Sequence, residues 1–129
     1  MSTGGLRLVG IGLDSVDVER LGRMLARRPR LVERLFTDRE QAYAAGLVNP
    51  ATYYAGRFAA KEATMKSLGV GLGALDWWDL EVRRLEGGRP ELVVSGRAAE
   101  LAAALGVGGW QMSITHTATV ASAVVAALA

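Results

Sequence analysis

The sequence predicts an α+β fold in which a small antiparallel sheet packs against helices, one of them long and central. Three observations indicate this class. A strand-like apolar segment lies near the start, residues 51–68 form a long helical segment, and two apolar runs end the sequence. Because 129 residues, half of them hydrophobic, can bury one proper core, we expect a single domain over residues 1–129.

The composition narrows the possible functions. Cysteine is absent, which excludes disulfides, thiolate zinc sites and a cysteine nucleophile, and is consistent with a reducing compartment. The net charge of +2 is too small to define a nucleic-acid-binding protein. Residues 1–7 lack the features of a signal peptide, and no apolar run is long enough to span a membrane. We therefore expect a cytoplasmic protein that engages neither nucleic acid nor membrane.

The first half of the chain is predicted to be one strand followed by helices. Residues 6–13 alternate as a strand does, and Gly10 and Gly12 leave one face nearly bare. Either a ligand or a tightly packed helix could approach that face, and both alternatives stay open. Helices are expected from about residue 15, around residues 31–36, from the capping box Thr37–Glu40 to about Ala45, and over residues 51–68, closed by Gly69.

The second half is predicted to be mainly strand. Residues 80–85 and 91–95 flank a glycine-containing turn, which predicts an antiparallel hairpin. A helix is expected over residues 97–105. Residues 110–115 and 120–128 then form two strands joined by a polar turn, although the alanines of the second also favour a helix.

Two carboxylates are notable because their neighbours are apolar and small. Asp14 closes the first strand and Glu62 lies inside the long helix, where a lone charge is costly unless a cation or hydrogen bonds offset it. Two oxygen ligands from separate elements, with Arg57, Lys61 and Lys66 close by, suit a magnesium ion that holds a phosphorylated substrate. Taken singly, Glu62 could form a surface ion pair with Lys66, and Asp14 could cap the following helix.

Two other segments could contact phosphate groups. His116 is the only histidine, and the hydroxyls of Thr115 and Thr117 suit phosphate oxygens, although a lone histidine in a turn is more often an ordinary surface residue. The Gly69–Gly73 stretch could offer backbone N–H groups to a phosphate. The Trp77–Trp78 pair is interpreted as an anchor of the core or of an interface.

Arginines gather between residues 20 and 34. Five of them recur at three- and four-residue steps, which aligns them along one side of a helix unless Pro29 bends it; they are Arg20, Arg23, Arg27, Arg30 and Arg34. A solvated helix face explains such a pattern as well as a docking surface does.

Three segments, in this order, closely resemble the signature segments of the holo-acyl-carrier-protein synthases, the small trimeric branch of the 4'-phosphopantetheinyl transferases. They are Gly10–Asp14, Arg57–Ala63 with Lys66 and Gly69, and Ser113–Thr117. The resemblance spans nearly the whole chain, and Val70 departs from the threonine that is more common there in the family. It implies a 4'-phosphopantetheinyl transferase-like fold.

The resemblance also implies a reaction. The family transfers the 4'-phosphopantetheine arm of coenzyme A to a serine of apo-acyl carrier protein and releases adenosine 3',5'-bisphosphate. By this resemblance Asp14 and Glu62 would bind Mg²⁺, and Glu62, a metal-bound water or Lys66 would take the serine proton. Coenzyme A would be contacted by Arg57, Lys61, Lys66, Gly69, Gly71, Ser113, Thr115, His116 and Thr117.

The implied partners are a homotrimer, with active sites between neighbouring subunits, and an acidic acyl carrier protein, docked by Arg20, Arg27, Arg30 and Arg34. Two rival hypotheses remain. A basic nucleic-acid module would leave Asp14 and Glu62 without a purpose, whereas a catalytically silent nucleotide-binding protein would fit the fold pattern equally well. The sequence leaves open which carrier protein is served, fatty-acid or secondary-metabolic, and whether acylated coenzyme A is accepted.

Overall fold

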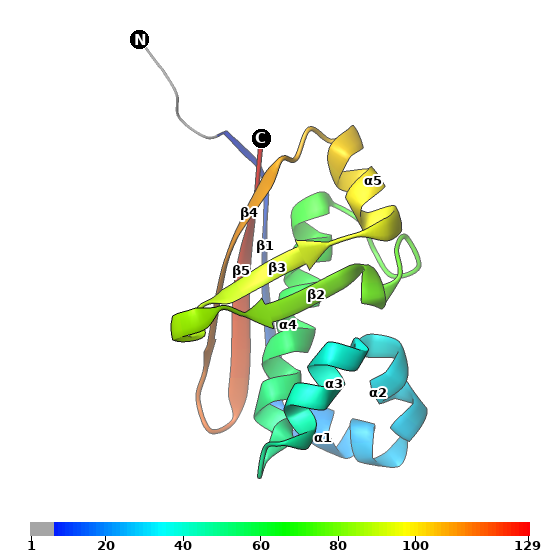
Figure 1. The fold of residues 1–129 in the computed structure, drawn as a ribbon, viewed down its shortest axis with the longest axis vertical. Helices are drawn as coiled ribbons and strands as arrows, with labels where there is room; N and C mark the ends of the chain where they lie inside the picture. Colours follow the sequence, from blue (N-terminus) through cyan, green and yellow to red (C-terminus); the bar gives the residue numbers. More distant parts are fainter. Residues whose placement is uncertain (1–6) are drawn as a thin grey trace.

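A single long helix, α4 (Pro50–Leu68), runs between a three-stranded sheet and a two-stranded hairpin in a computed structural model of the protein, which describes residues 7–129 (Figure 1). The large sheet contains β1 (Leu8–Asp17), β4 (Gly109–His116) and β5 (Val120–Leu128). The hairpin contains β2 (Leu80–Arg84) and β3 (Pro90–Val94). The remaining elements are α1 (Val18–Arg27), α2 (Pro29–Leu35), α3 (Asp38–Ala45), α5 (Gly96–Ala104) and the 3₁₀ turns η1 (Trp77–Asp79) and η2 (Glu86–Gly88).

The predicted α+β class, with its small antiparallel sheet and long central helix, is confirmed. The three strands lie in the order β1-β5-β4 and every pairing is antiparallel, so the last strand of the chain is the central one. The hairpin predicted between residues 80 and 95 is present, and residues 120–128 are strand rather than helix. Leu6, which the strand prediction included, lies outside the described residues.

The first strand is four residues longer at its end than expected, because its ladder with β5 continues to the pair Asp17 and Val120. Asp17, not Asp14, is the N-cap of α1, and its carboxylate accepts a hydrogen bond from the Arg20 N–H at 2.8 Å. Asp14 is therefore free of the capping role that the sequence left open.

The bare face of β1 is covered by α4, which settles the alternatives that the two glycines left open. A Cβ added to Gly10 would lie 1.9 Å from the carbonyl oxygen of Ser67, and one added to Gly12 would lie 1.8 Å from that of Ala63. Such distances are impossible for real side chains, so the two glycines permit the close approach of helix and strand.

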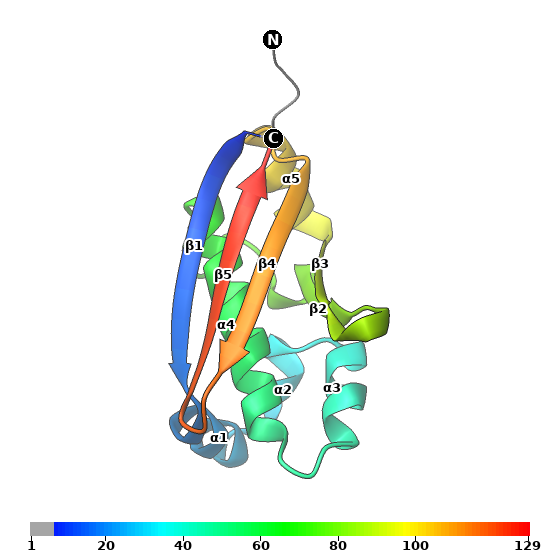
Figure 2. The same cartoon turned by 90° about the vertical axis from the view of Figure 1, so that its left-hand side faces the viewer.

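Alanines let α4 pack on two sides at once. Ala59, Ala60 and Ala63 are fully buried and share one cluster with Val82 and Leu92 of the hairpin and with Ala123 and Val125 of β5. Small side chains are required here because the two sheets approach the helix from different directions. In Figure 2 the three strands lie in front of α4, and no helix formed by residues 7–129 covers their other face.

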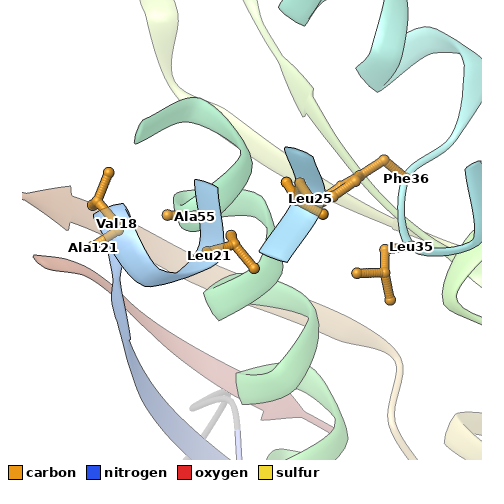
Figure 3. Packing of buried hydrophobic residues seen from close by; sticks show 7 residues of the cluster. All are labelled: Val18, Leu21, Leu25, Leu35, Phe36, Ala55 and Ala121. Carbon is orange, nitrogen blue, oxygen red and sulfur yellow. The ribbon is translucent and has the colours of Figure 1, made fainter. Parts of the chain in front are cut away.

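The helices α1, α2 and α3 close the lower end of the molecule in Figure 1. Pro29 stands at the first position of α2, so the arginine-rich segment is two helices rather than one. Their apolar residues meet α4 and β5 in a second cluster, drawn in Figure 3, made of Val18, Leu21, Leu25, Leu35, Phe36, Ala55 and Ala121.

Candidate active site

Asp14 and Glu62 come together across the contact between β1 and α4. Gly10 contacts Ser67 and Gly12 contacts Ala63, so each step of two residues along the strand, about 6.7 Å, corresponds to about one turn back along the helix, about 5.4 Å. The next step along the strand is Asp14, which therefore lies beside the turn that carries Glu62. The Lys66 ammonium donates to Asp14 Oδ1 at 3.0 Å and to the Leu13 carbonyl oxygen at 3.0 Å. Lys66 thus pairs with Asp14 and not with Glu62.

The electrostatics of Glu62 reflect this placement. Burial raises the pKa of the Glu62 carboxyl above its ordinary value, the negative charge of Asp14 raises it further, and the Lys66 ammonium lowers it. Two carboxylates that repel one another beside a single, half-exposed lysine favour an additional cation between them.

The donor set fits a magnesium ion that shares its coordination with a substrate. Within residues 7–129 no group of three or more histidine, aspartate or glutamate side chains could form a closed protein cage. Mg²⁺ typically takes one or two carboxylates and completes its shell with water and substrate phosphates. Asp14 and Glu62 supply such a pair.

A cavity of about 740 Å³ opens beside Glu62. Its walls are mostly apolar and come from α1, α2, α4 and the segment around η1, with Met24, Leu31, Phe58, Leu75 and Trp77 among the lining residues. Phe58 and Trp77 stack with ring centroids 5.4 Å apart, which makes one wall rigid. The carboxylate of Glu62 therefore lies where an apolar cleft meets a polar, acidic site.

The arginines predicted to dock a partner lie around this cleft. Arg20, Arg27, Arg30 and Arg34 are all exposed on α1 and α2. Arg34 lines the cleft itself, and Met24 links the cleft to a neighbouring hollow formed with Arg20 and Arg27. Arg23, the fifth arginine of the series, is paired with Glu19.

The structure does not bring Lys61 to the acidic pair, which corrects its prediction as a coenzyme A contact. Its side chain is fully buried, and its ammonium donates to Glu40 Oε1 and to the Leu35 carbonyl oxygen, each at 2.7 Å. Consecutive residues of a helix point in directions about 100° apart, so Lys61 faces the interior while Glu62 faces the cleft.

Arg57 lies against a tyrosine ring, whereas Lys66 lies beside the acidic pair. Its guanidinium lies over the Tyr53 ring, 4.2 Å from the centroid, and Arg84 of β2 lies over the Tyr43 ring at 5.4 Å. Burial lowers the pKa of Arg57, and in the described part of the chain its Nε is a buried nitrogen without a hydrogen-bond partner. An anion would satisfy such a group.

The predicted phosphate contacts on β4 are divided between the two faces of the sheet. The register aligns Asp14 with Ala123 and Ile114, so His116, two residues beyond Ile114, shares the face of Asp14. Ser113 and Thr115 point to the opposite face. Within one chain the structure therefore does not gather all of these residues around the acidic pair.

The hydroxyl of Thr117 is used inside the turn between β4 and β5. It accepts hydrogen bonds from the N–H groups of Thr119 at 3.2 Å and Val120 at 3.0 Å. His116 is exposed beside it. The turn thus presents the imidazole on a firm loop at the end of an edge strand.

The glycine-rich stretch after α4 has a structural role at its first residue. Gly69 ends the helix in the left-handed conformation with φ 70°, and its N–H is hydrogen-bonded to the Lys66 carbonyl oxygen at 3.0 Å. The C-terminal end of a helix presents carbonyl groups, which repel anions. The N–H of Gly69 is thus already bonded in the helix cap, while both Gly69 and Gly71 are exposed and unobstructed, and the predicted coenzyme A contact at the two glycines stays a prediction.

Several residues that shape the site escaped the sequence analysis. Phe58 and Trp77 form a wall of the cleft, Arg84 joins Arg57 beside the tyrosines, and Glu40 holds Lys61. The stacking partner of Trp77 and the charge partner of Lys61 are both about 20 residues away along the chain. The capping box did identify Glu40, but only for its local role.

Comparisons with known proteins identify the family of this chain. The sequence model of the 4'-phosphopantetheinyl transferase superfamily matches residues 10–124. The chain is 46% identical over 113 residues to a holo-[acyl-carrier-protein] synthase of Moorella thermoacetica, covering 88% of each, and 48% identical over 120 residues to one of Streptomyces griseus, covering 93% of this chain and 98% of the relative.

A solved structure adds a bound ligand to the comparison. The holo-(acyl-carrier-protein) synthase of Bacillus anthracis in complex with CoA (3',5'-ADP) is 33% identical and has a TM-score of 0.80, covering 97% of this chain and 99% of that one. No helix within residues 7–129 is long and apolar enough to cross a membrane. The chain belongs to the 4'-phosphopantetheinyl transferase superfamily and, within it, to the holo-acyl-carrier-protein synthases.

Proposed function

We propose that this protein transfers 4'-phosphopantetheine from coenzyme A to a serine of apo-acyl carrier protein and releases adenosine 3',5'-bisphosphate. The observation that carries the proposal is the meeting of Asp14 with Glu62, which lines an apolar cleft, in a chain of this family. Once a cation is bound, the acidic pair can hold a phosphate group of coenzyme A, and the apolar cleft can hold its extended pantetheine arm.

Asp14 and Glu62 would hold the Mg²⁺ ion. When bound, Mg²⁺ neutralises charge on the pyrophosphate and favours attack at phosphorus. Lys66 lies beside both carboxylates and can donate from its ammonium to a phosphate oxygen.

The chain's own residues then handle the proton. The serine Oγ of the carrier attacks the β-phosphorus of coenzyme A, and the bond from that phosphorus to the bridging oxygen breaks, so that the electron pair leaves with adenosine 3',5'-bisphosphate. Glu62 accepts the hydroxyl proton as the general base. Lys66 is the alternative acceptor or a stabiliser of the leaving phosphate.

Coenzyme A contacts would come from more than one chain. Arg57 has an unsatisfied Nε beside the exposed Arg84, which suits an anionic group of the nucleotide. His116, Ser113 and Thr115 lie on an edge strand, where they would contact coenzyme A held at the acidic pair of a neighbouring subunit. Gly69 and Gly71 remain candidates, whereas the fully buried Lys61 leaves the proposal.

A homotrimer is supported by the face of the large sheet that no helix covers (Figure 2). Ile11 and Leu13 of β1 expose 61% and 64% of their surfaces, and the register places Val124 of β5 beside Leu13. A row of exposed aliphatic residues on an open sheet face favours burial against further copies of the chain.

The carrier protein would dock on α1 and α2. Arg34 lines the cleft that contains Glu62, and Arg20, Arg27 and Arg30 line two hollows next to it, so an acidic partner attracted there would bring its serine near Glu62. Complementary charge chiefly raises the association rate and fixes orientation. We expect the reaction to take place in the cytoplasm, in keeping with the absence of cysteine.

The deciding experiment is mass spectrometry of apo-carrier protein incubated with this chain, coenzyme A and Mg²⁺. The carrier should gain the mass of one phosphopantetheine group, and the gain should vanish with EDTA, with Asp14→Asn and with Glu62→Gln. Glu91→Gln, which removes an exposed carboxylate from the distant hairpin, should leave the gain unchanged. No gain with the native chain would favour a catalytically silent nucleotide-binding protein.

A further inference from the structure

Lys61 and Glu40 form a buried ion pair next to the active site but outside it. The Lys61 ammonium and Glu40 Oε1 are 2.7 Å apart, and the two side chains expose 0% and 1% of their surfaces. No substrate can therefore reach either group.

Each charged group is hydrogen-bonded to several elements. The three N–H donors of the ammonium have three acceptors: Glu40, the Leu35 carbonyl oxygen at 2.7 Å and the Trp77 carbonyl oxygen at 3.4 Å. Glu40 accepts from the Thr37 N–H at 2.9 Å through Oε1 and from the Val82 N–H at 2.9 Å through Oε2. The pair thus joins α4 to the end of α2, the start of α3, β2 and η1.

Two of these attachment points are walls of the cleft. Leu35 and Trp77 both line it, and Trp77 stacks on Phe58, which lies one turn before Glu62 on the same face of α4. Lys61 is the residue directly before Glu62. One buried ammonium therefore sets how far the η1 wall and the α2 wall lie from the turn that carries Glu62.

Stability alone does not account for a charged pair at this position. Removing two charges from water is costly, and apolar residues of similar volume often serve the fold equally well. Both side chains are removed from water, so the protein bears a desolvation cost here. Hydrogen bonds to particular carbonyl oxygens fix the distance and angle between the bonded groups, which apolar contacts do not.

We propose that Lys61 and Glu40 are positioning residues, which hold the Leu35 and Trp77 walls of the cleft in register with Glu62 for phosphopantetheine transfer. This inference rests on the proposed function. Displacing a reacting group by about 1 Å can cost on the order of 100-fold in rate, so loosening these walls should act on turnover rather than on the metal site.

The test uses Lys61→Met and Glu40→Gln, which keep side-chain size and remove one charge each. Thr64→Val is the matched control, because Thr64 is fully buried on the same helix and its hydroxyl donates only to the Ala60 carbonyl oxygen at 2.7 Å. All chains are assayed at a temperature where circular dichroism shows them folded. We expect kcat to fall at least about tenfold in both variants, Mn²⁺ affinity measured by electron paramagnetic resonance to stay within about twofold, and Thr64→Val to behave as the native chain.

A second readout does not depend on activity. In a Trp78→Phe, Trp110→Phe background Trp77 is the remaining tryptophan, and its fluorescence should become more accessible to acrylamide when Lys61 is replaced. Folded variants with native kcat and native quenching would overturn the proposal, as would failure of both variants to fold. A native chain that transfers nothing would refute the proposed function instead, while the quenching result would still judge the wall-positioning role.

Discussion

Gly12 passes so close to Ala63 that the helix carbonyl oxygen occupies the place of a side chain; a Cβ on Gly12 would lie 1.8 Å from it. Asp14 lies two residues after Gly12 on the same strand, and Glu62 lies directly before Ala63 on the same helix. The separation of the acidic pair is therefore set by the absence of a methyl group on Gly12.

Gly12→Ala should destabilise the fold by about 3 kcal/mol, since overpacking against backbone commonly costs about 1–3 kcal/mol and a backbone carbonyl cannot move aside alone. It should also reduce transfer activity in molecules that remain folded, because β1 and α4 must separate. Urea unfolding and the carrier assay measure the two effects. Gly71→Ala is the control, because no atom lies within 4 Å of its added Cβ; equal stability losses in the two variants would contradict the packing argument.

The pKa of Glu62 should move in opposite directions in two variants of the metal-free protein. Asp14→Asn removes a negative charge that raises this pKa and should lower it, whereas Lys66→Met removes a positive charge that lowers it and should raise it. Titration of the Glu62 carboxyl carbon by ¹³C NMR gives both shifts. Shifts of the same sign would show that the three groups are not coupled as described.

The raised pKa of Glu62 also determines whether this group's contribution to stability rises or falls with pH. The folded chain binds the Glu62 proton more tightly than the unfolded chain does, so this group's contribution to stability falls as pH rises from the ordinary glutamate pKa through the raised one. As a base, Glu62 acts only when deprotonated, so kcat should rise with pH on the acidic side as this carboxyl loses its proton. Glu62→Gln should remove this group's contribution to the pH dependence of urea unfolding.

Leu13→Lys should disrupt the proposed trimer and with it the activity, because it places a charge on the exposed aliphatic face of the sheet. Static light scattering gives the mass and the carrier assay gives the activity. Val48→Lys is the control, since Val48 is fully exposed in the turn before α4. A Leu13→Lys monomer with full activity would refute a site shared between subunits.

Mixing chains tests that sharing directly. Inactive Glu62→Ala and His116→Ala chains, dissociated together and reassembled, should regain part of the activity if the acidic pair and the imidazole of one site belong to different subunits. Each variant reassembled alone should stay inactive.

Arg20→Glu and Arg27→Glu should each raise the KM for the carrier protein about tenfold, corresponding to about 1.4 kcal/mol, and leave the KM for coenzyme A nearly unchanged. Added salt should narrow the difference from the native chain, because exposed charges are screened. Arg89→Glu, at an exposed turn of the hairpin, serves as the control. Unchanged carrier KM values at low salt would mean that the arginines are only a solvated surface.

Local signals predicted most of the secondary structure. The capping box at Thr37 and Glu40 has both of its hydrogen bonds, and Gly69 ends α4 in the left-handed conformation that glycine favours. The end of β1 was predicted too early because the polar residues Asp14 and Ser15 interrupt its apolar pattern, whereas the ladder with β5 depends on backbone groups.

The site was predicted in part, because sequence order does not show which side of a helix faces inward at a given turn. Glu62 and Lys61 are neighbours in a helical stretch rich in alanine, and only the packing of two sheets around α4 shows that the lysine is the buried one. The pairing of Lys66 with Asp14 likewise required the close contact at Gly12.

The central place of β5 has a consequence for how the protein is made. β1 and β4 each pair with β5 and not with one another, and β5 is synthesised after both of them. A growing chain therefore carries Asp14 and Glu62 long before any strand exists to hold β1 against α4 in the native register. The enzyme should remain inactive on the ribosome until residues 120–128 have emerged and paired with β1 and β4.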